Sequence, residues 1–182
     1  PIHEEIFMKQ RAVGVLILGL LLFSAAGAGA ADATQQKPSK PCTKAELVGT
    51  WDMVSVMPVL NKQDPTFYPY QKFAFNGNSS MKVMTSEKPF DAKALAAFKS
   101  QPTEIDYSLD PKGILTMTWS TRPHTEYAIC AYVLQEMPLE LLKKIPAERR
   151  AGVPKKGNVT LSFVGKNGKI AFQKVLKKAP HV

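Results

Sequence analysis

The chain of 182 residues is 45% hydrophobic and 21% charged, and its formal net charge at pH 7 is +9. This length permits one domain with a real core and is too short for two domains of comfortable size. Two cysteines and three histidines without metal-ligand spacing, and the absence of a glycine-rich phosphate loop, argue against a zinc module or a nucleotide-binding domain, so we expect neither a metal nor a cofactor.

The N-terminal stretch is the first element with a clear signature. Residues 8–31 begin with a methionine and two positive charges, continue with a short apolar run, and end in small residues that offer a cleavage site after Ala30. This order predicts a secretory signal peptide and a secreted or periplasmic protein, and residues 1–7 are expected to be no part of it. An uncleaved membrane anchor is the alternative, because residues 12–31 have the length to span a bilayer.

Domain boundaries follow from composition. Residues 1–30 are assigned to the upstream residues and the signal peptide. Residues 31–41 carry no large apolar side chain, which predicts a disordered leader. The folded domain is predicted over 42–178, and residues 179–182 form a tail.

The two cysteines, Cys42 and Cys130, both lie in the part that is expected to be exported. An oxidising compartment favours a disulfide bond between them. The alternative is a free, buried thiol at Cys130, because this residue lies in a hydrophobic strand pattern.

Hydrophobic and polar residues alternate with a period of two along most of the domain, which is the pattern of half-buried β-strands. Short turns around Gly77, Gly113 and Gly168 join them and make neighbouring strands antiparallel. Eight strands are predicted, at about residues 47–57, 70–76, 80–86, 103–109, 113–120, 125–134, 158–164 and 169–176.

Two short helices interrupt the strands. Asp91 can cap a helix in AKALAAFKS, and Pro138 opens a second helix in LELLKKI. A meander of eight antiparallel strands can close into a small barrel, which removes exposed edges and leaves an interior. The predicted fold class is therefore all-β, an eight-stranded antiparallel up-and-down barrel with two short helices.

The first strand carries a family resemblance. Its sequence AELVGTWDMVSVM resembles the first strand of the lipocalin-like (calycin) proteins, which begins with Gly-x-Trp after a flexible leader, and Gly49 and Trp51 match that motif. The segment YQKFAFNGNSSMKVMTS is similar, more loosely, to the second and third strands of bacterial secreted lipocalin-like domains. The resemblance implies that the tryptophan plugs the closed end of a barrel, with a basic side chain of the last strand against it.

Two parts of the family pattern differ here. The usual arginine of the last strand has no counterpart in KIAFQKVLKK, which offers only Lys174, Lys177 and Lys178. The Thr-Asp-Tyr segment of the family corresponds at best to a Thr-Glu-Tyr sequence at residues 125–127. The alternative is another β fold in which Trp51 is an ordinary core aromatic residue.

Candidate ligand-binding residues are large, mostly apolar side chains of the predicted strands. They are Phe73, Phe75, Met84, Tyr107, Met117, Trp119 and Tyr127. A cavity lined in this way favours a flat or elongated hydrophobic small molecule. The alternative is a barrel filled by its own side chains, which residues of this type serve equally well.

Positive charge is concentrated near the C-terminal end. Residues 31–138 carry eleven basic and eleven acidic side chains, whereas residues 139–182 carry eleven basic and two acidic ones. Such an excess attracts anionic lipid, an anionic envelope polymer or an acidic protein, although lysines also protect strand edges and keep secreted proteins soluble. Nucleic acid is not expected, because interleaved aromatic residues are missing. The predicted basic patch surrounds the second helix and consists of Lys143, Lys144, Arg149, Arg150, Lys155 and Lys156.

Three functional hypotheses follow. The leading one is a monomeric, non-catalytic, secreted lipocalin-like protein that binds and transports a small hydrophobic molecule. An envelope interaction or stress module that uses the basic patch on an anionic membrane surface or an acidic envelope partner is the alternative. A barrel enzyme with His124 as general base, oriented by Glu126, is the third, but no motif ties a nucleophile to this pair, and no catalytic residue is assigned.

Overall fold

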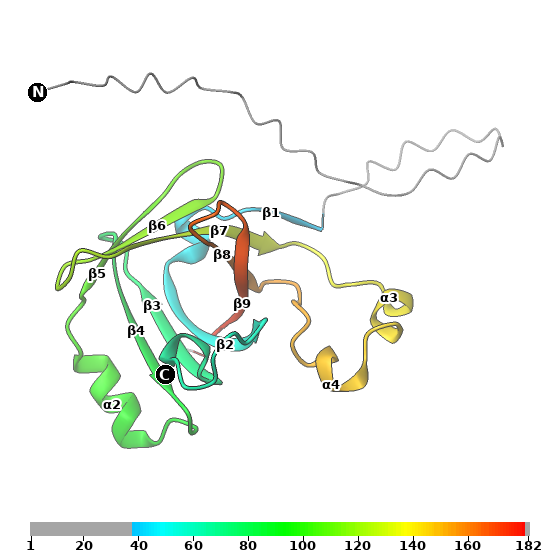
Figure 1. Ribbon diagram of the computed structural model, residues 1–182, viewed down its shortest axis with the longest axis horizontal. Helices are drawn as coiled ribbons and strands as arrows, with labels where there is room; N and C mark the ends of the chain where they lie inside the picture. The colour runs from blue at the N-terminus through cyan, green and yellow to red at the C-terminus, as the bar shows by residue number, and fades with distance from the viewer. Residues whose placement is uncertain (1–37, 181–182) are drawn as a thin grey trace, which may run out of the picture. The chain divides into compact units, whose positions relative to one another are not determined.

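The computed structural model describes residues 38–180, and the signal peptide expected over residues 8–31 lies outside this range. Within it, strands β2 to β9 each pair with the next strand along the chain, and β9 pairs back with β2 (Figure 1). The sheet is therefore a closed, eight-stranded, antiparallel up-and-down barrel. The fold class expected from the sequence is confirmed.

The barrel strands lie close to their predicted positions, because the alternating pattern and the glycine turns both bound them. In chain order they are β2 (Gly49–Met57), β3 (Tyr70–Phe75), β4 (Ser80–Ser86), β5 (Ile105–Leu109), β6 (Ile114–Trp119), β7 (Thr125–Val133), β8 (Val159–Val164) and β9 (Ile170–Lys178). A bulge in β2 between Met53 and Ser55 shifts its pairing with β9 by one residue.

A ninth strand, β1 (Ser39–Pro41), precedes the barrel and pairs with the end of β7, where Ser39 lies opposite Val133. Ser39–Pro41 of the expected disordered leader therefore form a strand, and residues 31–37 lie outside the described residues. The pattern of the sequence gives no sign of β1, because the strand contributes no large apolar side chain to the core.

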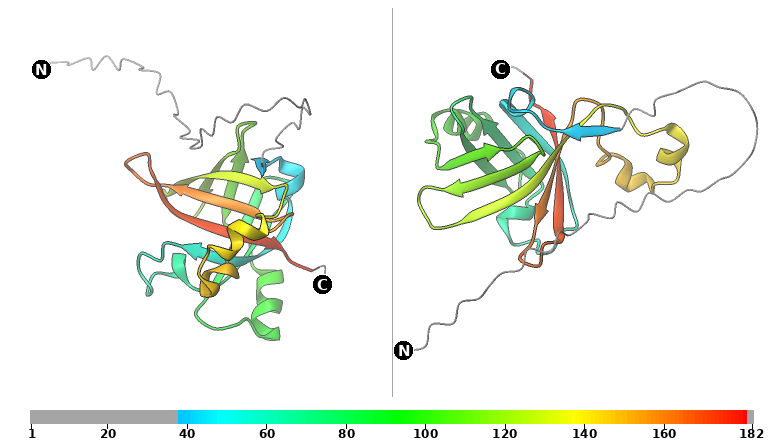
Figure 2. Two further views of the ribbon diagram at one scale, coloured as in Figure 1. Left: turned by 90° about the vertical axis from the view of Figure 1, so that its right-hand side faces the viewer. Right: turned by 90° about the horizontal axis from the view of Figure 1, so that it is seen from above.

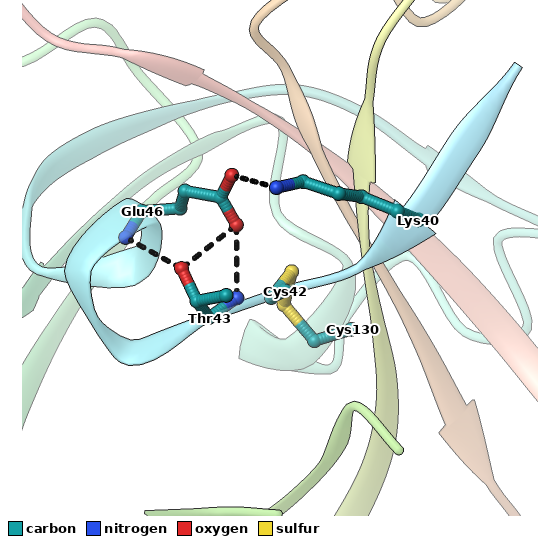
Figure 3. Close-up of polar contacts among 5 residues, drawn as sticks. All are labelled: Lys40, Cys42, Thr43, Glu46 and Cys130. Carbon is teal, nitrogen blue, oxygen red and sulfur yellow. Dashed lines mark hydrogen bonds and ion pairs between the residues drawn. A yellow bond between two sulfur atoms is a disulfide. The ribbon is translucent and has the colours of Figure 1, made fainter. Parts of the chain in front are cut away.

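Helix α1 (Lys44–Leu47) follows β1 and begins with a capping box. The backbone N–H of Glu46 donates to the Thr43 hydroxyl, and the Glu46 carboxylate accepts the Thr43 backbone N–H at 2.9 Å (Figure 3). The Lys40 ammonium lies 2.7 Å from the same carboxylate. These contacts hold the lead-in segment against the barrel.

Cys42, between β1 and α1, lies beside Cys130 of β7 (Figure 3). Their sulfur atoms are 2.05 Å apart, the distance of a disulfide bond, and their Cα atoms are 5.4 Å apart. The expected pairing is confirmed, and no free cysteine remains among the described residues. The alternative of a buried free thiol at Cys130 is therefore wrong.

The two expected helical inserts are present, with one difference. Helix α2 (Ala92–Ser100) begins where the Asp91 carboxylate accepts the Ala94 N–H at 2.7 Å. The second insert consists of two helices, α3 (Leu139–Lys143) and α4 (Ala147–Arg150), because Pro146 cannot continue a helix. Both lie to one side of the barrel (Figures 1 and 2).

A short 3-10 helix, η1 (Pro65–Phe67), lies between β2 and β3. No helix of residues 38–180 combines the length and the apolar character needed to cross a bilayer.

Candidate ligand-binding site

The closed end of the barrel is plugged by Trp51. This side chain is 1% exposed, and its indole N–H donates to the Leu47 carbonyl at 2.7 Å. The Lys178 ammonium lies 4.6 Å from the centre of the indole ring. A basic side chain of the last strand therefore lies against the tryptophan, as the resemblance implied, and it is a lysine.

Gly49 of the Gly-x-Trp motif leaves room for this lysine. The residue has a φ of +130°, and a Cβ atom there would lie 2.6 Å from the Lys178 nitrogen. That nitrogen donates to the Val48 carbonyl at 2.6 Å, so it is fixed over the ring. Any larger residue at position 49 would displace the cation from the tryptophan.

Aromatic packing fills the barrel directly above the plug. Phe75 and Tyr107 meet edge to face with ring centres 5.4 Å apart, and the Tyr107 hydroxyl donates to the Asn76 carbonyl at 2.7 Å. Both side chains are almost fully buried in the core. They face the interior as expected, but they fill the half of the barrel next to Trp51 and do not line the cavity.

The other half of the barrel holds a cavity of about 220 Å³. Three of the expected ligand-binding residues line it, namely Phe73, Met117 and Trp119. The expected alternatives were an open cavity and a filled interior, and the structure combines them: one half is packed and the other is hollow. Further lining residues include Met81, Val83, Ile105, Glu126, Phe163 and Lys174.

The expected inward position is wrong for two residues, Met84 and Tyr127. Met84 lies opposite Lys72, which forms an ion pair with Asp52 on the outer face, and Tyr127 is 51% exposed. Each strand has apolar residues in both phases at this point, so alternation alone cannot choose the inner face. The inner positions belong to the neighbouring residues of the same strands.

Lys174 is the most unusual residue of the cavity, because its charge lies inside the barrel. The residue is only 5% exposed. Its ammonium lies between 5.3 and 5.6 Å from the ring centres of three phenylalanines, Phe73, Phe163 and Phe172. From the sequence, this lysine is one charge of the basic C-terminal excess and one of three candidates for the side chain against Trp51. In the structure Lys178 takes that position, and Lys174 lies inside the barrel.

Gln71 supplies the polar contact of this lysine. The Lys174 ammonium donates to Gln71 Oε1 at 2.7 Å. The side-chain amide nitrogen of Gln71 in turn donates to the carbonyls of Thr66 and Tyr68, at 2.8 and 2.9 Å. The loop before β3 therefore holds the glutamine in one orientation, with its oxygen toward the lysine.

Burial lowers the pKa of Lys174 from its ordinary value of 10.5 to about 8. Desolvation of the charged amine is the main cause, and the more distant carboxylates of Glu126 and Asp64 act in the opposite direction. The amine is thus still mainly protonated at neutral pH, and its charge is poorly solvated.

The cavity reaches the barrel wall where β4 and β5 separate. Only two residue pairs join these strands, at Ser80 and Met81. Beyond them, cavity-lining residues come from both sides of the gap, with Val83 and Thr85 on β4 and Glu104 just before β5. The cavity is therefore bounded by residues from both sides of this gap.

His124 and Glu126 form the pair that the enzyme hypothesis requires, with Nε2 of the histidine 3.0 Å from the carboxylate. The His124 ring lies 4.8 Å from the Trp119 ring and is largely exposed. No hydrogen bond joins this pair to a serine or cysteine among residues 38–180. Through Glu126 the pair contributes a polar group to the edge of the cavity, where the Arg122 guanidinium also lies 5.2 Å from the centre of the Trp119 ring.

No family model, curated protein or solved structure matches this chain.

In the described part of the chain, no group of three His, Cys, Asp or Glu side chains is placed to hold a metal ion.

A second depression of about 660 Å³ lies outside the barrel, between α2 and the outer face of β2 and β3. Leu95 and Phe98 of α2 line it together with Ala74. None of the expected ligand-binding residues faces it. The inner cavity is therefore the candidate site.

The basic patch lies on α3, α4 and the segment that follows. Some of its charges serve local structure: Arg150 donates to the carbonyls of Ile145 and Lys143, and the Lys143 ammonium lies 3.0 Å from Glu140. Two large apolar side chains in the same helices are exposed, Leu139 by 64% and Leu141 by 49%. Charge and exposed apolar surface thus occur together on this side of the barrel.

Proposed function

We propose that this protein is a secreted or periplasmic, lipocalin-like carrier that binds a small hydrophobic molecule inside its barrel without chemical conversion. The observation that carries the proposal is the cavity of about 220 Å³ in the half of the barrel away from Trp51, lined by Phe73, Met117 and Trp119. The Trp51, Lys178 and Gly49 arrangement supports the family resemblance. The bonded cysteines agree with an oxidising compartment.

The cavity size limits the ligand. Pockets for drug-sized molecules have about 300–1,000 Å³, so this one suits a small or slender molecule, whose end can protrude through the gap between β4 and β5. Burying about 200 Å² of apolar ligand surface at about 25 cal/mol/Å² contributes about 5 kcal/mol. A neutral ligand is therefore expected to bind with a dissociation constant on the order of 0.1 mM.

Filling the cavity should weaken binding. Val83 lines the cavity and is partly exposed, so Val83→Phe can fold while its ring occupies ligand space. Loss of about 60 Å² of contact costs about 1.5 kcal/mol, which is about tenfold in affinity. Titration with 1-octanol, followed by the fluorescence of Trp119 at the cavity, measures the change.

Met84→Phe is the matched control, because Met84 is the next residue of the same strand and faces outward opposite Lys72. It should leave the affinity unchanged. Equal weakening in both variants, or no saturable fluorescence change in the unmodified protein, would contradict binding inside the barrel.

A second function is favoured by one observation, the exposure of Leu139 and Leu141 beside the basic patch. Apolar side chains that enter a bilayer surface, flanked by lysines and arginines, are typical of proteins that dock on anionic lipid. We propose, as the alternative function, that this surface docks the protein on an anionic membrane.

Vesicle sedimentation tests this alternative. Vesicles rich in phosphatidylglycerol should bind the protein at about 0.01 M salt and release it at about 1 M salt, where the Debye length falls to about 3 Å. Leu139→Ser together with Leu141→Ser should reduce binding severalfold. Ile170→Ser, which changes an equally exposed apolar residue on the β8–β9 hairpin, is the control. If the control variant and the double variant bind alike, the surface has no such role.

A further inference from the structure

We propose that the ligand carries a carboxylate and that the ammonium group of Lys174 binds it inside the barrel. This inference rests on the proposed function and narrows it to a ligand class, a slender apolar acid. Its apolar part occupies the cavity lined by Phe73, Met117 and Trp119, and its acid group lies at the lysine.

The first support is that the charge of Lys174 lacks a counter-ion in the protein. A buried ammonium is costly unless it is paired. Among the described residues Lys174 forms no salt bridge, and its one hydrogen bond, to Gln71, uses one of three donors. An anion brought by a ligand would complete its contacts.

The second support comes from the charged groups around the lysine. Glu126 on β7 and Asp64 before η1 act on it only at longer range. The other charged residues that line the cavity are Lys82, Glu104 and Arg122. Together with Lys174 and Glu126, these residues give the lining three cations and two carboxylates. A lining with this excess of positive charge favours an anionic ligand over a cationic one.

The third support is the position of the ammonium relative to the cavity. Lys174 lines the cavity although it is only 5% exposed to solvent. Gln71, held by the loop carbonyls, accepts a hydrogen bond from the ammonium, and three phenylalanine rings lie around it. A charge-assisted hydrogen bond formed at such a buried group is stronger than one at a surface.

Proton linkage gives the proposal a distinctive sign. The pKa of the free Lys174 amine is lowered to about 8, and a bound carboxylate favours the protonated form and therefore raises it. Binding of an acid should accordingly weaken as the amine loses its proton. From about pH 7 to about pH 9 the protonated fraction, and with it the acid affinity, falls about tenfold. The affinity of a neutral alcohol should stay constant.

The experiment compares octanoate with 1-octanol, which share an apolar chain and differ in charge, by isothermal titration of the full exported chain. Octanoate should bind at least about tenfold more tightly, as expected for a hydrogen bond to a charged group. Lys174→Met keeps the length of the side chain and should abolish this preference, while 1-octanol binding persists. The pH profile of the unmodified protein gives a second readout that needs no folded variant.

Arg122→Met is the matched control, since Arg122 is another cation of the cavity lining. It should retain the preference for the acid. Loss of the preference in this variant alone would assign the carboxylate to the rim and overturn the proposal. Equal binding of acid and alcohol by the unmodified protein would also overturn it but leave the carrier function standing. Failure of both probes to bind would contradict the carrier function itself.

Discussion

Reduction of the bond between Cys42 and Cys130 should lower the free energy of unfolding by about 4–5 kcal/mol, because the bond closes a loop with a sequence separation of 88 residues. Its opening restores chain entropy to the unfolded state. It also releases the segment of β1 and α1 from β7, where the Cys42 N–H donates to the Cys130 carbonyl at 3.1 Å. Urea unfolding with and without dithiothreitol measures the difference.

The double variant Cys42→Ala, Cys130→Ala is the control for this measurement. It should be as unstable as the reduced protein and should not respond to the reductant. A change below about 1 kcal/mol on reduction of the unmodified protein would contradict the role of the bond as the main covalent restraint on the fold.

Trp51→Ala should destabilise the protein by about 3–5 kcal/mol. The indole is 1% exposed, and its N–H donates to the Leu47 carbonyl. The Lys178 ammonium makes a cation–π contact with its ring. Alanine leaves a cavity at the closed end, an unpaired carbonyl, and a lysine without its aromatic partner. Thermal and urea unfolding, monitored by circular dichroism, report the loss.

Trp119→Ala provides the comparison for this variant, since Trp119 is only partly buried and lies at the cavity. It should cost clearly less stability and affect ligand binding more. If Trp51→Ala leaves the unfolding midpoint nearly unchanged, the tryptophan is not the plug of the barrel, and the resemblance loses its best residue.

The barrel was predictable because its signals are local. Alternation placed the strands, and glycine turns such as Gly113 and Gly168, which both have positive φ, fixed their order. The Asp91 cap located α2 for the same reason. Signals of this kind need no knowledge of distant contacts.

The cavity was predictable only in part, because it depends on distant contacts. Gln71 and Lys174 are 103 residues apart. The polar Gln71 was not expected inside, and Lys174 was considered only as one of three candidates for the side chain against Trp51. A signal did exist: Gln71 shares its phase with Phe73 and Phe75, and Lys174 shares its phase with Phe172 and Leu176. Two polar residues in the inner phase of separate strands can satisfy each other, and the sequence does not say which ones do.

The central claim, that a small molecule binds inside the barrel, is tested most directly by the methyl signals of ¹³C-labelled methionines. Met81 and Met117 line the cavity, whereas Met84 faces outward and Met57 and Met137 are exposed. On titration with octanoate, the signals of Met81 and Met117 should shift together and saturate with one dissociation constant, while those of Met57, Met84 and Met137 stay in place. No saturable shift of Met81 and Met117, or a shift confined to Met137 next to α3, would contradict the claim.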